Sequence, residues 1–468
     1  MLLVLVLLLV ALAPGAAAQP TNILIFIADD QGEGDLSIYG HPSLSTPNID
    51  RLGREGMRFD TAFLTISSCS PSRSSILTGR YPHSTGAEDL HMSLPADQQT
   101  IAQRLRNENY HNMAVGKWHL GDAEKRHWDV VVDCPGRATA DQAVKALSER
   151  PQDRPFFFWV ASKDPHRPFD ENAIAKPHDP ADVVVPPYLP DHPLVRRDLA
   201  LYYDEVTRFD SHVGEIVAEL ERQEVLDKTL IVYMSDNGMP FPRAKTTLYD
   251  AGIRTPMLVR LPGTVPAGSV QKGLFSVVDL APTLLDVAGY ELDSAQGISR
   301  ADMLRDAEAP GPDAIYAEAN WHDFEQFTRA VRTERFLLIR NYYWQKPLWN
   351  SVDSINSITW KGYLQMQRLG RLTEAQEFLF LEPRPYEELY DLQVDPVSLR
   401  NVAGTVDYQV ELNRLRALLD NWRVETGDIM PAQPRRDGWT RDGVPLPHNQ
   451  PWYRRYIQAG GRSSFERF

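Results

Sequence analysis

Four short, largely apolar segments recur along the first half of the chain, and a polar segment follows each one. They lie at 22–28, 110–115, 155–161 and 229–235. Short runs without apolar–polar alternation are typical of strands that are buried on both faces of a parallel sheet. We therefore expect a central sheet whose strands end at polar residues.

Segments with helical periodicity separate these strands and predict the layers that cover the sheet. Between 199 and 221, apolar residues recur at helical spacing, as at Leu201, Val213 and Val217. Further helices are expected at 46–56, 74–78, 100–108 and 281–288, with an additional strand at 57–63. This alternation indicates an α/β fold with a large mixed, mostly parallel sheet flanked by helices.

The pattern changes after residue 305. Residues 297–312 carry turn residues and charges, which is typical of a domain boundary. A chain of 468 residues also exceeds the size at which a single core stops growing, roughly 250 to 300 residues. We expect a larger domain at 19–305 and a smaller C-terminal α+β domain at 306–468. Its antiparallel sheet would use strands at 314–317, 328–333, 335–340 and 388–392.

The N-terminal segment predicts export. Residues 2–12 are an unbroken apolar run, and an Ala-x-Ala cleavage pattern follows at 16–18. We interpret residues 1–18 as a signal peptide, with an uncleaved anchor as the alternative, because the segment lacks a basic residue. No later stretch of 18 apolar residues is found, so stable membrane insertion is not expected.

Composition limits the partners of the protein. With 43% hydrophobic and 24% charged residues, the chain is typical of a globular protein. A formal charge of −14 argues against nucleic acid as a partner, because that requires a broad basic surface. It still allows a small basic pocket for an anionic substrate.

Chemically versatile residues follow each of the four predicted strands. Their shared position matters because ligands of open α/β sheets bind at the carboxyl ends of the strands. Any one of these groups could be an ordinary turn or a solvated charge, but four of them indicate one site. The residues are Asp29 and Asp30, Lys117 and His119, His166, and Asp236 with Asn237.

The two cysteines, Cys69 and Cys134, allow several interpretations. In an exported protein they could form a disulfide. Cys69 could instead be an activated thiolate, since a helix continuing through 74–78 would direct its N–H groups and positive dipole end at residue 69. It could also be inert.

The residues around Cys69 resemble a known signature. Cys69, Pro71 and Arg73, followed by Leu-Thr-Gly-Arg at 77–80, match the motif of type I sulfatases, which belong to the alkaline-phosphatase-like superfamily. The resemblance implies that Cys69 is oxidised to formylglycine, whose hydrate is the nucleophile. It also implies a formylglycine-generating or anaerobic sulfatase-maturating enzyme as a partner, and it leaves Cys134 as a lone thiol. The domain at 19–305 would then be catalytic.

Site roles follow from the same resemblance. A calcium ion is implied, held by Asp29, Asp30, Cys69, Asp236 and Asn237, and the hard oxygen atoms of the Asp and Asn side chains by themselves suit Ca²⁺ or Mg²⁺. Arg73 and His119 would orient and deprotonate the hydrate, and His166 would protonate the leaving atom. Lys117 and Lys245 would neutralise the sulfate.

Within the family, the segments 236–249, 164–167 and 386–396 look most like the sulfamidase branch, which removes N-linked sulfate from heparan-type glucosamine. Lys245 departs from that branch, which has Arg at this position. The Lys ammonium is a point charge, whereas an Arg guanidinium can form two parallel hydrogen bonds. This departure leaves the substrate open. The alternatives are an O-sulfatase acting on another glycan, such as an algal one, a phosphate or phosphonate monoester hydrolase, or a non-catalytic glycan binder if Cys69 is unmodified.

The substrate expected from this resemblance is a sulfated saccharide, and a homodimer is possible. Rim loops set the identity of the sugar. Candidates for that rim are His91, Trp321 and His322.

Overall fold

The computed structural model describes residues 21–134 and 136–432. The predicted signal peptide at 1–18 and residues 433–468 of the predicted second domain lie outside them. The strands of the described part are β1 Asn22–Ala28, β2 Met57–Phe59, β3 Ala62–Phe63, β4 His111–Gly116, β5 Val130–Val132, β6 Phe156–Ala161, β7 Thr229–Ser235, β8 Met257–Arg260, β9 Ser269–Gln271, β10 Phe275–Ser276, β11 Ile315–Trp321, β12 Glu325–Arg332, β13 Phe336–Asn341 and β14 Glu387–Asp391.

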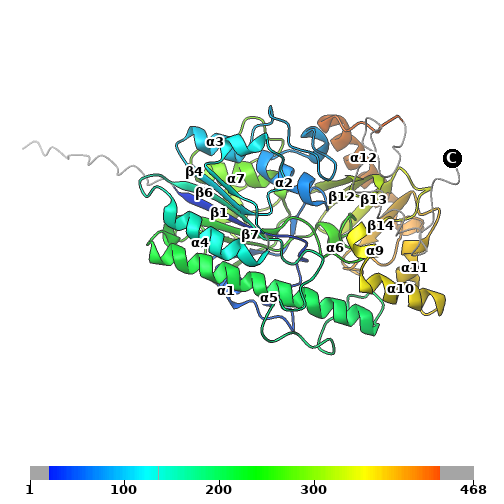
Figure 1. Cartoon of the computed structure of the whole chain (residues 1–468). Coiled ribbons are helices and arrows are strands. Elements are labelled where there is room, and N and C mark those ends of the chain that lie inside the picture. The colour runs from blue at the N-terminus through cyan, green and yellow to red at the C-terminus, as the bar shows by residue number, and fades with distance from the viewer. Residues whose placement is uncertain (1–20, 135, 433–468) are drawn as a thin grey trace, which may run out of the picture.

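Helices connect and cover these strands. They are α1 Pro47–Arg54, α2 Cys69–Thr78, α3 Ile101–Asn107, α4 Thr139–Glu149, α5 Pro193–Arg222, α6 Asp250–Ile253, α7 Leu280–Val287, α8 Ala301–Arg305, α9 Val352–Ile355, α10 Ile358–Arg368, α11 Glu374–Glu377 and α12 Gln409–Thr426. In Figure 1, α1, α4 and α5 lie on one face of the large sheet, and α2, α3 and α7 lie on the other.

The large sheet has eight strands in the order β5-β4-β6-β1-β7-β8-β2-β9. Only β8 runs antiparallel to its neighbours β7 and β2. The four strands expected from the apolar segments are adjacent and mutually parallel, as β4-β6-β1-β7. Every residue of these four strands is buried, which explains why their sequences do not alternate. The predicted mixed, mostly parallel sheet is confirmed.

A second sheet of four antiparallel strands, β11-β12-β13-β14, lies beside the first (Figure 1) and confirms the predicted C-terminal sheet. Helix α12 covers it through Leu412, Leu415, Leu419 and Trp422. The boundary between two domains near residue 305 stays a prediction.

The sequence prediction was wrong at 57–63. This segment is two strands: β2 joins the large sheet, while β3 pairs with β10 in a separate two-stranded sheet. Asp60 and Thr61 form the bend between them, and Asp60 accepts a hydrogen bond from Arg58 at 2.7 Å. The helix expected at 199–221 is also longer, because His192 caps its start at Pro193.

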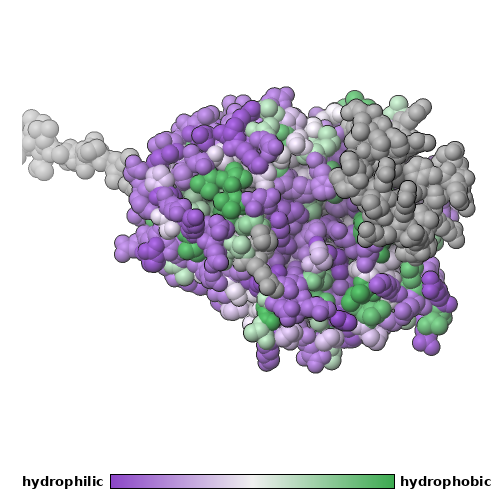
Figure 2. All heavy atoms as spheres, in the orientation of Figure 1, coloured by the Kyte–Doolittle hydropathy of each residue, from purple (hydrophilic) through white to green (hydrophobic). Residues whose placement is uncertain are grey.

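The face shown in Figure 2 is mostly hydrophilic, with small separate hydrophobic areas. Among the described residues, no helix is both long and apolar enough to cross a membrane.

A buried ion pair fastens the end of α12 to the antiparallel sheet. Arg329 on β12 donates two hydrogen bonds to Asp428, at 2.8 and 2.7 Å, and Arg423 donates a third at 2.7 Å. Burial raises the pKa of Asp428, but the Arg329 guanidinium outweighs it and holds the pKa below its usual range.

We predict that Asp428→Ala lowers the free energy of unfolding by about 3–5 kcal/mol, because Arg329 is left buried and unpaired. The Asp428 pKa is lower in the folded than in the unfolded state, so its stabilisation is present above the unfolded pKa of about 3.9 and is lost as the pH falls below it. Denaturant unfolding at pH 7 and at pH 3 should show the difference from wild type shrinking at pH 3. Exposed Asp407→Ala is the matched control. Equal stability of the two variants would contradict the prediction.

Candidate active site

The carboxyl ends of β1, β4, β6 and β7 place the predicted polar residues at one edge of the large sheet. Asp29 and Asp30 follow β1, and Asp236 and Asn237 follow β7, which pairs with β1 in register. Lys117 comes directly after β4. The convergence expected from the sequence is therefore observed for the strand ends.

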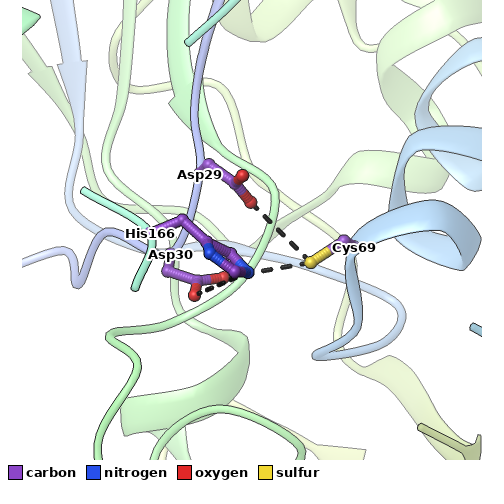
Figure 3. A group of neighbouring side chains, drawn as sticks. All are labelled: Asp29, Asp30, Cys69 and His166. Carbon is purple, nitrogen blue, oxygen red and sulfur yellow. Dashed lines mark hydrogen bonds and ion pairs between the residues drawn. The ribbon is translucent and has the colours of Figure 1, made fainter. Parts of the chain in front are cut away.

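Cys69 enters this edge from helix α2. It is the first residue of the helix, Ser68 is the N-cap residue, and the side chain is 2% exposed. Its Sγ atom lies 3.7 Å from Asp29 Oδ1 and 4.0 Å from Asp30 Oδ1 (Figure 3). Both cysteines are free, so the disulfide considered from the sequence is not formed.

The thiol of Cys69 is not activated by this environment. Burial raises its pKa far above the usual value, and the nearby Lys117 and Lys245 ammonium groups do not offset that effect. A reactive cysteine needs a lowered pKa. This environment therefore opposes a thiolate at Cys69.

Three buried carboxylates next to Cys69 each bind a cation, of which Arg73 and Lys245 are buried and Lys117 is partly exposed. Lys117 Nζ lies 2.6 and 2.8 Å from the two oxygens of Asp29. Lys245 Nζ lies 2.7 Å from Asp30 Oδ2. Arg73 donates two hydrogen bonds to Asp236 Oδ2, at 2.9 and 2.7 Å. Burial raises the pKa of Asp29, but Lys117 and the other neighbouring cations hold it below its usual range.

The chemistry of these residues fits a hard divalent cation. Ligand atoms of Asp29, Asp30, Cys69 and His166 all lie within 4.8 Å of one another. Asn237 Nδ2 donates to Asp30 Oδ1 at 2.5 Å, while Asn237 Oδ1 is buried without a hydrogen-bond partner. A buried carbonyl oxygen without a partner is costly. A cation such as Ca²⁺, which prefers oxygen ligands, would satisfy it.

The contacts of Asp236 and His166 differ from those expected for the predicted metal site. The two Asp236 oxygens already accept hydrogen bonds, Oδ1 from the Asp30 backbone at 3.2 Å and Oδ2 from Arg73. His166 was expected as a proton donor, yet it lies in the group of possible ligands (Figure 3). The metal roles of Asp236 and His166 stay open predictions.

Arg73 and His119 occupy different layers of the site. Arg73 is fully buried and also donates to the Lys117 carbonyl at 2.7 Å. His119 faces the cleft, where its Nε2 lies 2.7 Å from His91 Nδ1. Burial and the Lys117 ammonium hold the pKa of His119 well below its usual range. The environment therefore favours the neutral imidazole of His119.

A cleft of about 440 Å³ opens above Cys69. Its wall includes the four histidines 91, 119, 166 and 322 and the three lysines 117, 163 and 245. His91 and His322, expected at the rim, line it. Trp321 does not, because it is 4% exposed and packs against Cys69 and Leu90 below the cleft.

Three carboxylates of the cleft were missed by sequence reasoning: Asp133, which follows β5, and two later residues, Asp323 and Asp353. Asp353, on the short helix α9, lies 3.2 Å from Lys245 Nζ and 3.5 Å from His166 Nε2. Asp323 follows His322 and accepts a hydrogen bond from the Val352 backbone at 2.7 Å. Neither of the two later residues follows an apolar strand of the large sheet, so the pattern that identified the other residues contained no signal for them.

Family models match most of the described chain. The family described as "Sulfatase" matches residues 21–290, more than half of the chain. The model described as "N-sulphoglucosamine sulphohydrolase, C-terminal" matches residues 243–357.

Individual proteins are similar over nearly the full length. Human N-sulphoglucosamine sulphohydrolase is 30% identical, covering 89% of this chain and 92% of the relative. An ulvan-active sulfatase of Formosa agariphila is 29% identical, covering 87% of this chain and 75% of the relative. The structure of BT4656 in complex with its substrate D-glucosamine-2-N,6-O-disulfate superposes with a TM-score of 0.67 at 22% identity, covering 88% of this chain and 99% of that chain, which shows a shared fold.

We predict that Ca²⁺ stabilises the protein against heat. A ligand that binds only the folded state stabilises it by about 2.7 kcal/mol at 100 times its Kd. The midpoint of thermal unfolding should therefore be higher in calcium than in EDTA. Asn237→Ala, which removes the unpartnered oxygen, should reduce this shift, and exposed Asn413→Ala should retain it. A wild-type midpoint that does not respond to calcium, or a full shift in Asn237→Ala, would contradict the assignment.

Proposed function

The chain belongs to the sulfatase family, and on that basis we propose that it is an exported enzyme that hydrolyses sulfate from a saccharide by means of a formylglycine at position 69. The favoured substrate is heparan-type N-sulfoglucosamine. The observation that carries the proposal is the position of Cys69 at the start of α2, with Sγ 3.7 Å from a carboxylate that binds Lys117.

The cleft is suited to a sulfate group. Lys117 and Lys245 bring two positive charges close to Cys69, and a dianionic or monoanionic group would be neutralised by them. The site is small and polar, which agrees with a single sulfated sugar as the occupant. The acidic surface elsewhere does not interfere, because charges beyond about 8–10 Å are screened at physiological salt.

The chain's own residues can be assigned to distinct tasks. A formylglycine at position 69 would supply a hydrated aldehyde as the nucleophile, and a calcium ion held by Asp29, Asp30, Asp236 and Asn237 would draw electron density from the sulfate. His119, neutral in this site, would accept the proton of the attacking hydroxyl. His166 would donate a proton to the leaving atom, while Arg73 would hold Asp236 in place.

The preference for N-linked sulfate is supported by two comparisons. The model of the N-sulphoglucosamine sulphohydrolase C-terminal region matches at 243–357, which includes Lys245 and Asp353. The human relative of that name is 30% identical over almost the full chain. Hydrolysis of O-sulfate esters in an algal glycan is the second candidate, because an ulvan-active sulfatase is 29% identical. The maturation enzyme and a homodimer stay predictions.

The substrate can be tested by release of free sulfate from a panel of N-, 6-O- and 2-O-sulfated heparan fragments and algal sulfated glycans. We expect the highest kcat/KM on fragments with a terminal N-sulfoglucosamine, and Cys69→Ala should lower it at least about 10³-fold. Mass analysis of the peptide spanning residue 69, from protein made in its natural host, should show formylglycine. A peptide with only unmodified cysteine would refute the proposed chemistry, and activity confined to O-sulfates would refute the substrate.

The proton-donating role of His166 makes a separate prediction. His166→Ala should slow hydrolysis of saccharide sulfates by about 10²–10⁴-fold, since their leaving groups need a proton. Activated aryl sulfates, whose leaving groups depart as stable anions, should slow far less. Steady-state kinetics on both substrate classes checks this. Equal losses on the two classes would show that His166 acts in some other way.

A further inference from the structure

Asp353 has one oxygen bound within the site and one oxygen left for a ligand. Oδ2 lies 3.2 Å from Lys245 Nζ and 3.5 Å from His166 Nε2. For Oδ1 there is no hydrogen-bond partner among residues 21–134 and 136–432, and the side chain is 33% exposed. Asp353 also lines both the cleft above Cys69 and a neighbouring cleft of about 440 Å³ that contains Arg167 and Arg197. The Asp353 side chain therefore borders space that a substrate can enter.

The segment that carries Asp353 is firmly attached to the segment that carries Lys245. The Arg243 backbone donates to Asn350 Oδ1 at 3.0 Å, and Thr246 Oγ1 donates to the Trp349 carbonyl at 3.4 Å. The Val352 backbone is held by Asp323. Because both sides of the contact are fixed, Asp353 and Lys245 keep their relative position without a ligand, as a preorganised binding group requires.

The position of Asp353 relates it to the leaving group and not to the sulfate. A carboxylate repels sulfate oxygens, and Lys117 and Lys245 are already assigned to bind those oxygens. His166, the residue assigned to the leaving atom, lies between Asp30 and Asp353, with its Nε2 3.8 and 3.5 Å from their oxygens. A leaving atom that receives a proton from His166 is therefore next to Asp353.

We propose that Asp353 selects N-linked sulfate, by accepting a hydrogen bond from the sulfamate N–H at the scissile bond. This inference rests on the proposed function. The bridging oxygen of a sulfate ester has no hydrogen and would place its lone pairs against the carboxylate. Sites that bond a substrate N–H discriminate strongly against analogues that lack it, because a buried acceptor is then left unpaired.

The reaction strengthens this contact. In the overall step, R–NH–SO₃⁻ and H₂O give R–NH₃⁺ and SO₄²⁻: the S–N bond breaks, nitrogen keeps the electron pair, and it takes up protons. Nitrogen becomes positive only as it takes up protons, so its attraction to Asp353 grows as His166 protonates it in the transition state. Interactions of that kind accelerate the chemical step.

The variant Asp353→Asn separates selection from positioning. Lys245 donates hydrogen bonds only, so the amide oxygen should stay at Lys245 and the amide NH₂ should face the cleft. The free acceptor becomes a donor, while the contact to Lys245 is kept. Exposed Asp122→Asn, which makes the same chemical change outside the cleft, is the matched control.

The first test uses D-glucosamine N-sulfate and D-glucose 2-O-sulfate, which differ only in NH or O at the scissile linkage. Asp353→Asn should lower kcat/KM for the N-sulfate by about 10- to 100-fold, the effect of one hydrogen bond to a charged group. The ratio of kcat/KM for the N-sulfate to that for the 2-O-sulfate should fall by about tenfold or more, whatever loss the two substrates share through Lys245 and His166, and Asp122→Asn should leave this ratio unchanged. Equal losses on both substrates, or no loss, would overturn the proposal.

The second test needs no turnover and uses protein with Cys69→Ser. NMR titration should show that glucosamine binds at least about fivefold more tightly than glucose, and Asp353→Asn should remove this difference. If the Cys69→Ser protein with Asp353 intact binds the two sugars equally, the role of Asp353 is overturned, even when the enzyme is an active sulfatase. Selective glucosamine binding in a protein that releases no sulfate would instead overturn the proposed function alone.

Discussion

Charge pairing among buried groups is the interaction on which the candidate site depends. Asp29 with Lys117, Asp30 with Lys245 and Asp236 with Arg73 bring three carboxylates and three cations together below the cleft. Burying an unpaired charge is far more costly than burying a pair, so each group fixes the position of its partner. These pairs join residues that are 88, 215 and 163 positions apart in the chain. The site is therefore a consequence of the whole sheet and cannot be assembled from one segment.

Helix α2 is the second constraint. All ten of its residues are buried, although six of them are Ser, Thr or Arg. Part of this polar segment is held in the interior by hydrogen bonds: Thr65 donates to Ser75 at 2.7 Å, and Arg73 bonds both Asp236 and the Lys117 carbonyl. The hydroxyls of Ser72 and Ser74 have no hydrogen-bond partner among the described residues. The helix presents residue 69 at its N-terminus, where backbone N–H groups favour negative charge. The same burial keeps the cysteine thiol protonated.

The C-terminal part of the chain contributes to the cleft as well as to stability. Asp323 lies between β11 and β12 and Asp353 between β13 and β14, and both line the cleft together with the lysines and histidines that follow the strands of the large sheet. In the proposed function, the large sheet would hold the groups that act on sulfate, and the later segments would supply groups on the sugar side. Substrate preference can then change with the later segments while the sulfate chemistry is preserved.

The amino-acid sequence by itself determined the four buried strands, their polar ends and the signature around Cys69. These features are local, because a strand buried on both faces needs an apolar run and its end needs a turn. The sequence pattern wrongly predicted one strand at 57–63, where a bend at Asp60 redirects the chain to a different sheet. It contained no signal for Asp353. Asp353 lies 108 residues from Lys245 and follows no apolar strand. Only tertiary packing of 349–353 against 243–246 brings that carboxylate to the cleft, since a contact between distant segments depends on the shapes of both.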